Sequence, residues 1–425
     1  MGPELDKLAI DGGRPVAAGP FPAPWLGPAA IGEEEVEAVA EVVRSKCLFR
    51  FLDHKNSHCS RLEALFREFT GCEYALAVGG GTGALICGLV GIGVGDGDEV
   101  ILPAYTYIAS PSAVLICGGV PVIAEIDETL TIDPDDVERK ITERTKAIMP
   151  VHMRGIPCDM DRVLEVARRH DLLVIEDVAQ ACGGTYKGRR LGSLGDAGCF
   201  SLQQYKVMTA GEGGMVVTDK REVFERAAIR HDSAMCFWNP EDTTVGPFPG
   251  ENFRMNEMEG ALGCVQFGRI EAILARTREL HRRIREAVAD CPGIRVAPSA
   301  DPQGDCGITV NMLFDSGGRA KRFAEALRAE GIPAGSMYDE GIPDRHIFRF
   351  WEYVMEKRSS DPHGWPWTSP LHDTGRTYSP DMCPRTLEVL GRTVTVPLSQ
   401  TYDDQHAEWI MRGVRKVANA LAAEA

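Results

Sequence analysis

Short apolar segments alternate with segments of helical spacing through the first half of the chain, and this alternation constrains the fold more than any other feature. The strand-like segments are residues 74–78, 99–103, 121–126, 147–151 and 172–175. Helical patterns separate them at 82–90, 110–117 and 160–169. Strands that alternate with helices form a mainly parallel sheet covered by helices on both faces. Ligands of such sheets bind at the carboxyl ends of the strands.

The length of the chain predicts more than one domain. With 425 residues it exceeds the size at which a single hydrophobic core usually stops growing. We expect an N-terminal arm over 1–28, a large domain over 29–265 and a smaller C-terminal α+β domain over 266–425. The smaller domain carries an insertion at about 341–382 that is rich in Trp, Pro, His and Gly.

The charge and the cysteines exclude several classes of function. The net charge of −16, from 46 basic and 62 acidic side chains, argues against nucleic acid or an anionic membrane as a partner, because both need clustered positive charge. The 13 cysteines include no CxxC pair, so no metal site is predicted and the thiols are expected to be reduced. We expect no signal peptide and no membrane span, which predicts a cytoplasmic protein.

Two segments carry residues with a chemical meaning. Residues 174–181 read as a buried strand that ends in the acid Asp177, and residues 200–214 read as a strand followed by Lys206 and a glycine-rich turn. Pyridoxal phosphate (PLP) needs both parts, because a lysine amine forms a Schiff base with its aldehyde and a carboxylate keeps its pyridine nitrogen protonated. Alone, the lysine would read as a surface group and the aspartate as a helix cap. Their combination predicts catalytic roles for both.

A glycine-rich turn follows the first predicted strand and opens a helix. The free N–H groups of a helix N-terminus suit a phosphate dianion, and glycine lets the backbone approach it closely. Gly81, Thr82 and Gly83 are therefore candidate phosphate ligands, although a glycine-rich turn is a weak signal by itself.

These segments resemble the DegT/StrS-type sugar aminotransferases, which are PLP enzymes of the aspartate-aminotransferase fold. Five blocks follow one another in the order found in that family: 77–85, 102–110, 175–181, 200–214 and 252–257. The resemblance implies an α/β large domain with a mainly parallel seven-stranded sheet and a smaller C-terminal domain. It also implies PLP as the cofactor and a homodimer with shared active sites.

The resemblance assigns roles to further residues. Gln180 lies where the family has a side chain beside the phenolic oxygen of the ring, and Ser201 resembles its second phosphate hydroxyl. Tyr107 matches the aromatic residue that stacks on the ring, with Tyr105 as the competing candidate. Asn252 matches a residue that reaches the phosphate of the neighbouring subunit.

Three more residues are candidates for contact with substrate. Arg254 follows Asn252 in the same block and is expected either to bind substrate or to hold the interface. His152 and Arg154 lie at a predicted strand end near the cofactor, and a structural role is an equal alternative for both.

The resemblance implies a transaminase that moves an amino group from glutamate or glutamine to a keto or aldehyde carbon of a sugar, cyclitol or related polyol. Biosynthesis of amino sugars for antibiotics, other natural products or surface polysaccharides is the expected setting. A sugar dehydratase of the same fold is disfavoured, because such relatives carry histidine in place of Lys206. A lyase or a C–C bond-forming PLP enzyme stays open. A non-catalytic sensor is disfavoured by the presence of both Lys206 and Asp177.

Overall fold

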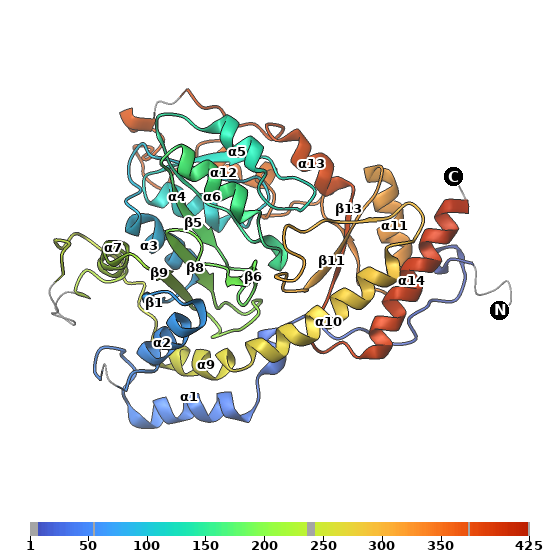
Figure 1. Cartoon of the computed structure of the whole chain (residues 1–425), viewed down its shortest axis with the longest axis horizontal. Helices are drawn as coiled ribbons and strands as arrows, with labels where there is room; N and C mark the ends of the chain where they lie inside the picture. The colour runs from blue at the N-terminus through green and yellow to red at the C-terminus, as the bar shows by residue number, and fades with distance from the viewer. Residues whose placement is uncertain (1–6, 54–55, 236–242, 373–374, 424–425) are drawn as a thin grey trace.

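The computed structural model of the chain describes residues 7–53, 56–235, 243–372 and 375–423 (Figure 1). A large sheet with helices around it fills one end of the molecule, and a smaller sheet with its own helices fills the other. The long helix α10 (Ile270–Val288) runs from the first body to the second, where it packs against α14 (Asp404–Ala423). The proposed domain boundary near residue 265 falls at the end of α9 (Glu257–Phe267), just before α10.

Seven strands of the described chain form the large sheet. Their order is β1 (Tyr74–Val78), β9 (Gly214–Thr218), β8 (Ala197–Ser201), β5 (Leu173–Asp177), β4 (Thr145–Ile148), β2 (Glu99–Pro103) and β3 (Val120–Ala124). Strands β8, β5, β4, β2 and β3 are parallel to one another, whereas β9 is antiparallel to both of its neighbours. The predicted mainly parallel seven-stranded sheet is confirmed.

Helices cover both faces of this sheet, so successive residues of a strand enter different cores. On β2, Val100 and Leu102 lie in one apolar cluster and Ile101 lies in the other. The helices on the first face are α3 (Gly81–Gly91), α4 (Ala109–Ile116) and α7 (Arg221–His231). Those on the second face are α2 (His58–Thr70), α5 (Pro134–Lys140) and α6 (Met160–Arg169). Burial on both faces explains the continuous apolar runs of the parallel strands.

The helix α1 (Glu33–Ser45) lies outside the second face, along α9, as Figure 1 shows. Its buried Glu35 accepts a hydrogen bond from Gln266 Nε2 at 3.0 Å and pairs with Arg269. Because each carboxylate oxygen has a protein partner, the burial of this charge is compensated.

The smaller body is built on an antiparallel sheet. Its four strands, among the residues that are described, are β10 (Arg295–Val296), β11 (Thr309–Leu313), β13 (Thr393–Pro397) and β12 (Gly335–Ser336), in that order. Helices α10, α11 (Gly317–Ala329) and α14 bury a third apolar cluster against it. This is the α+β arrangement expected for the C-terminal domain.

The N-terminal arm connects the two bodies. Residues 1–6 of the proposed arm lie outside the described part, and the rest contains the short turns η1 (Ala9–Asp11) and η2 (Gly27–Ala30). The buried carboxylate of Glu330 accepts hydrogen bonds from the N–H groups of Ala9 and Val16. At the end of the arm, Gly27 N–H donates to the carbonyl oxygen of Lys206 at 3.1 Å.

The insertion at 341–382 leaves the small sheet but packs on the large domain. Trp351 is fully buried in a cluster that also contains residues of α3 and α4. Farther along, Arg376 forms an ion pair with Glu99 of β2 at 2.6 Å. The sequence predicts the insertion, whereas its position on the large domain is a finding of the structure.

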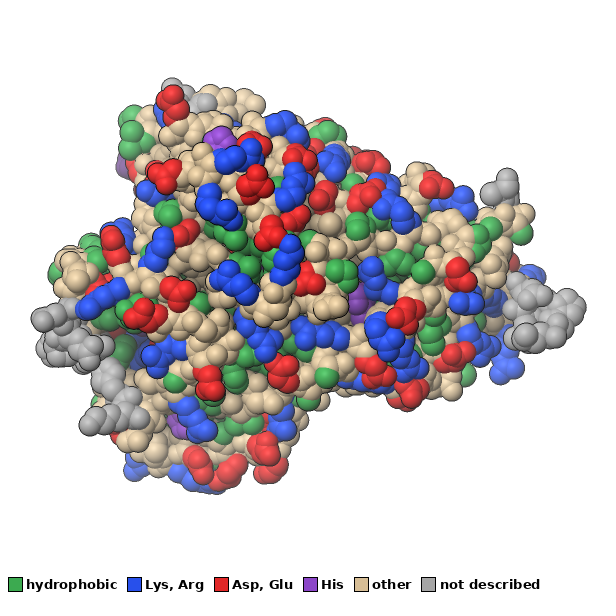
Figure 2. All heavy atoms as spheres, viewed as in Figure 1, with side chains coloured by type: hydrophobic (Ala, Val, Ile, Leu, Met, Phe, Trp, Pro, Cys, Tyr) green, Lys and Arg blue, Asp and Glu red, His purple; other side chains and the backbone are tan. Residues whose placement is uncertain are grey.

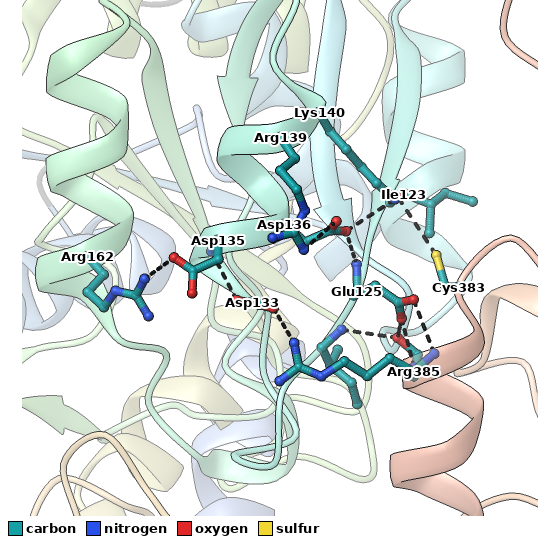
Figure 3. A network of polar contacts seen from close by, with 12 residues as sticks. Ile123, Glu125, Asp133, Asp135, Asp136, Arg139, Lys140, Arg162, Cys383 and Arg385 are labelled. Atoms are coloured by element: carbon teal, nitrogen blue, oxygen red, sulfur yellow. Dashed lines mark hydrogen bonds and ion pairs between the residues drawn. The ribbon is translucent and has the colours of Figure 1, made fainter.

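A polar network fastens the helix that follows the insertion, α13 (Pro384–Gly391), to the edge of the large sheet (Figure 3). Glu125 accepts hydrogen bonds from the N–H groups of Arg385 and Thr386 at 3.2 and 2.7 Å. Arg385 also pairs with Asp133 at 2.6 Å. A carboxylate at a helix N-terminus compensates the unpaired N–H groups there.

The surface carries charges of both signs. Acidic and basic side chains intermix over the face shown in Figure 2. None of the helices in the described part combines the length and the apolar character that a bilayer crossing requires. Within the same residues, no group of three His, Cys, Asp or Glu side chains is placed to hold a metal ion.

We predict that Trp351→Ala lowers the free energy of unfolding by about 3–5 kcal/mol, because the indole is fully buried and its removal leaves a cavity. Ile342→Ala, in the same insertion but 66% exposed, should change it by less than about 0.5 kcal/mol. Chemical denaturation followed by tryptophan fluorescence and circular dichroism measures both. Equal effects of the two substitutions would contradict the docking of the insertion.

Candidate active site

Asp177 ends β5 at the carboxyl edge of the parallel strands. The side chain is 4% exposed, and its two oxygens accept hydrogen bonds from Ser110 Oγ at 2.9 Å and from Ala179 N–H at 3.0 Å. Burial raises the pKa of Asp177, whereas these hydrogen bonds and the ammonium group of Lys206 oppose the rise. The carboxyl group is thus oriented by two hydrogen bonds and shielded from water.

The hydroxyl of Ser110 was not predicted as part of the site. It lies in the first turn of α4, is fully buried, and also contacts Thr106 Oγ1 at 2.7 Å. These hydroxyls fix the rotamer of Asp177 through a hydrogen-bond chain. The sequence signal was present, since Ser110 closes the block 102–110, but a serine at a helix start reads first as a cap.

Lys206 lies in the turn between β8 and β9, half-buried. Burial lowers the pKa of its amine, and the carboxylates of Asp177 and Glu212 oppose the lowering. Among the described residues its amine makes no hydrogen bond or ion pair. A lysine with a lowered pKa and a free amine suits covalent attachment and proton transfer.

The main chain of Lys206 is held on two sides. Its N–H donates to the carbonyl of Gln203 at 3.0 Å, and its carbonyl accepts a hydrogen bond from the N–H of Gly27 in the arm. A Cβ added at Gly27 would lie 2.8 Å from the nitrogen of Thr209, so only glycine allows this approach. The arm therefore supports the lysine loop directly.

The turn at 79–83 forms the expected cradle at the start of α3. Ala84 donates the first intrahelical hydrogen bond to Gly80, so the N–H groups of Gly81, Thr82 and Gly83 precede the helical ladder. Ser201, at the end of β8, lies opposite: a Cβ added at Gly81 would be 2.7 Å from the Ser201 Cβ. The Ser201 side chain thus lies next to the unpaired N–H groups at the start of α3.

The two candidate tyrosines differ in their surroundings. Tyr105 is fully buried and its hydroxyl accepts a hydrogen bond from Arg154 Nε at 2.6 Å. The ring of Tyr107 is 47% exposed, which leaves it available to a ligand. The geometry favours Tyr107 for stacking and a core position for Tyr105.

The side chain of Gln180 is hydrogen-bonded to the main chain of Arg154. Gln180 Oε1 accepts from Arg154 N–H at 3.1 Å, which leaves the Gln180 Nε2 group as a donor. Arg154 has φ = 53° and precedes Gly155 at φ = 78°. This left-handed pair turns the chain after Val151, so that the guanidinium group reaches Tyr105.

His152 lies in a fully buried network beneath the site. Its Nε2 lies 3.1 Å from Glu176 Oε2, and its Nδ1 accepts from Cys158 N–H at 3.1 Å. Glu176 also accepts from the N–H groups of Gly192 and Leu194. Both ring nitrogens are occupied by protein partners, so the geometry favours the structural alternative for His152 over substrate binding.

The block 252–257 lies beside the phosphate turn, since Gly79 N–H donates to the carbonyl of Phe253 at 2.7 Å. Asn252 is exposed, and its Oδ1 accepts from Arg254 N–H at 3.3 Å. The Arg254 guanidinium pairs with Asp232 at 3.2 Å and lies over the ring of Phe49. Its charge is already compensated, which favours the interface alternative for Arg254.

The residues fit PLP. The phosphate has the unpaired N–H groups at the start of α3 as donors, with the Ser201 side chain packed next to Gly81. The buried carboxyl group of Asp177 suits a protonated ring nitrogen, and Asp177 and Lys206 are close enough to interact electrostatically.

Comparisons with known proteins agree with this geometry. Residues 29–363 match the model of the DegT/DnrJ/EryC1/StrS aminotransferase family. The chain belongs to this family. The family resemblance, the aminotransferase class and PLP as the cofactor, all predicted from the sequence, are confirmed.

Three relatives show how far the likeness extends. The chain is 45% identical to the GDP-perosamine synthase of Caulobacter vibrioides over 50% of its own length, and the match spans only 57% of that relative. It is 34% identical to a putative L-glutamine:3-amino-2,3-dideoxy-scyllo-inosose aminotransferase of Micromonospora echinospora, over 77% of this chain and 78% of the other. The structure of S. venezuelae DesV with a ketimine intermediate matches this chain with a TM-score of 0.73 and 29% sequence identity. The match covers 91% of this chain and 94% of the DesV chain.

In this aminotransferase, we predict that PLP followed by borohydride labels Lys206 ahead of every other lysine. The unprotonated amine reacts, and burial lowers the pKa of Lys206, so labelling should persist at pH values where exposed lysines are protonated. Peptide mass spectrometry after labelling across a pH series measures this.

The matched controls are Lys206→Arg, which should abolish the labelled peptide, and Lys220→Arg, which removes an exposed lysine paired with Asp196 and should leave it intact. Labelling spread evenly over the surface lysines would contradict the assignment of Lys206.

Proposed function

We propose that this protein transfers an amino group from glutamate or glutamine to a keto or aldehyde carbon of a sugar, cyclitol or related polyol. The observation that carries the proposal is the electrostatic interaction between Asp177, at the carboxyl end of β5, and a lysine of lowered pKa, within a chain of this family. The names of the Caulobacter and Micromonospora relatives support a sugar or cyclitol acceptor. Amino-sugar or aminocyclitol biosynthesis in the cytoplasm is the proposed setting.

PLP, when bound, supplies an aldehyde that takes up the amino group and a ring that accepts electrons. Asp177 would hold the proton on the ring nitrogen, with Ser110 and the Ala179 N–H fixing the direction of its carboxylate. Lys206 would carry the proton during transfer, because its lowered pKa provides a free amine. Gln180 would donate from Nε2 to the phenolic oxygen, and Tyr107 would stack on the ring.

The phosphate would bind at the start of α3. The N–H groups of Gly81, Thr82 and Gly83, together with the hydroxyls of Thr82 and Ser201, provide its hydrogen bonds. A dianion at this place also interacts favourably with the helix dipole.

Arg154 is the best-placed residue to bind the carboxylate of the amino donor. Of its guanidinium nitrogens, Nε alone makes a hydrogen bond within the described chain, to Tyr105. The terminal nitrogens remain as a pair of donors, which matches the geometry of a carboxylate. Arg254, paired with Asp232, is proposed to hold the subunit interface instead.

The active unit is proposed to be a homodimer in which Asn252 reaches the phosphate of the partner subunit. Asn252 is exposed in the single chain, as are the apolar side chains of Val36 and Val43 on α1 and of Leu48 and Leu52 after it. An exposed apolar face of this kind supports a self-complementary contact between two copies.

We predict that one of the two donors converts the absorbance of the PLP-bound protein to that of pyridoxamine phosphate, and that a keto sugar or keto cyclitol reverses the change. The Lys206→Ala variant should bind PLP without this conversion, because the proton carrier is missing. Stopped-flow absorbance with L-glutamate and L-glutamine measures the first step. A protein whose bound PLP responds to neither donor would overturn the transaminase assignment in favour of another PLP reaction.

We predict that two inactive variants, Lys206→Ala and Asn252→Asp, recover activity when mixed after unfolding and refolding together. A carboxylate at 252 would repel the phosphate of the neighbouring subunit, whereas a hybrid dimer retains one complete site. Recovery should reach roughly a quarter of the wild-type donor conversion, since about half of the dimers are hybrids. A mixture of Lys206→Ala with Lys206→Arg is the control, and equal recovery in both mixtures would contradict the shared site.

A further inference from the structure

The insertion brings a second set of polar groups to the mouth of the site. Its residues 345–348 run beside the loop 104–108: Thr106 N–H donates to the carbonyl of His346 at 2.9 Å, and Ile108 N–H donates to that of Arg345 at 3.0 Å. In the other direction, Phe348 N–H donates to the carbonyl of Ala104 at 2.9 Å. The main chain makes these contacts, while Ile347 and Phe348 are buried in the core and the side chain of His346 is partly exposed.

His346 lies against the residue proposed to stack on the cofactor ring. Its ring centroid is 5.2 Å from that of Tyr107, and its side chain is partly exposed. The same loop leads to the ring-nitrogen carboxylate, because Thr106 Oγ1 contacts Ser110 Oγ and Ser110 Oγ donates to Asp177. His346 is therefore placed at the open side of the pocket.

Asp344 fixes the orientation and the tautomer of His346. Its Oδ1 accepts from His346 N–H at 2.9 Å and lies 2.8 Å from His346 Nδ1. In the neutral ring, the proton on Nδ1 then faces the carboxylate, and Nε2 carries a lone pair. Among the described residues, Nε2 has no hydrogen-bond partner. The pair thus presents one directed acceptor to the pocket.

The two substrates of the proposed reaction differ in what they need at this place. The amino donor carries carboxylates, for which Arg154 is suited, whereas a sugar or cyclitol carries hydroxyl groups. A neutral imidazole nitrogen accepts a hydrogen bond from a hydroxyl but repels a carboxylate. Arg154 and His346 therefore suit different substrate groups, although Arg154 and Asp344 are close enough to interact electrostatically.

We propose that His346, oriented by Asp344, binds a hydroxyl group of the polyol acceptor, so that the insertion supplies acceptor recognition to a site that the large domain otherwise builds. This inference rests on the proposed aminotransferase function and extends it to a named specificity residue.

The test separates the two half-reactions in the PLP-loaded protein. L-Glutamate is the donor probe, and GDP-4-keto-6-deoxymannose and scyllo-inosose are the acceptor probes, used on the pyridoxamine form. The variants are His346→Ala, His346→Gln and Asp344→Asn. The matched control is His363→Ala, because His363 lies in the same insertion and its N–H makes the same contact to an aspartate two residues earlier, Asp361.

We expect His346→Ala to raise the acceptor KM about tenfold, the effect of one lost hydrogen bond, with the donor step and the thermal unfolding midpoint unchanged. His346→Gln should recover part of the loss, since its amide oxygen can take the place of Nε2. Asp344→Asn should give a smaller increase, because the ring keeps its position but loses the fixed tautomer. His363→Ala should behave as wild type.

An acceptor KM that stays unchanged in His346→Ala, or a donor step that slows equally, would overturn the inference while leaving the proposed function intact. A wild-type protein that reacts with L-glutamate but with neither acceptor probe would overturn the polyol acceptor itself, and the role of His346 with it.

Discussion

The burial of Asp177 near the amine of Lys206 is the constraint on which the rest of the site depends. A carboxylate with 4% exposure is costly unless hydrogen bonds and a nearby cation compensate it, and Ser110, Ala179 and Lys206 provide both. The same burial lowers the pKa of Lys206. Burial thus acts on both groups in opposite directions, and the attraction between the two charges opposes both shifts.

The parallel sheet makes this pairing possible because it brings distant segments to one edge. β5 delivers Asp177, β8 delivers Ser201, and β1 delivers the turn before α3. Elements outside the sheet then hold the lysine loop: Gly27 of the arm donates to Lys206, and Gln266 of α9 accepts from Thr209. The insertion closes the opposite side by pairing its backbone with the loop of Tyr107.

The strands of the sheet and the residues at their ends could be predicted from the sequence, because local patterns along the chain indicate them. Continuous apolar runs identified the buried strands, and a carboxylate and a lysine at fixed places after them identified the cofactor. The hydrogen-bond partners of Ser110, the burial of Tyr105 and the enclosed network of His152 were decided by the fold. These depend on which side chains meet across the fold, and spacing along the chain carries no such information. The insertion shows the same limit, since its composition revealed an unusual segment but not the surface on which it packs.

The sequence by itself determined the fold class and the cofactor, and it predicted Lys206 and Asp177 as the two residues that act on it. Periodicity and glycine placement act locally, and the five ordered blocks are specific to one family. Only the tertiary structure decided which of the two tyrosines is exposed, that the arm contacts the lysine loop through Gly27, and where His346 and Asp344 lie. Burial and hydrogen-bond partners are properties of packed surfaces, and residues as far apart as Tyr107 and His346 become neighbours only when the chain has folded.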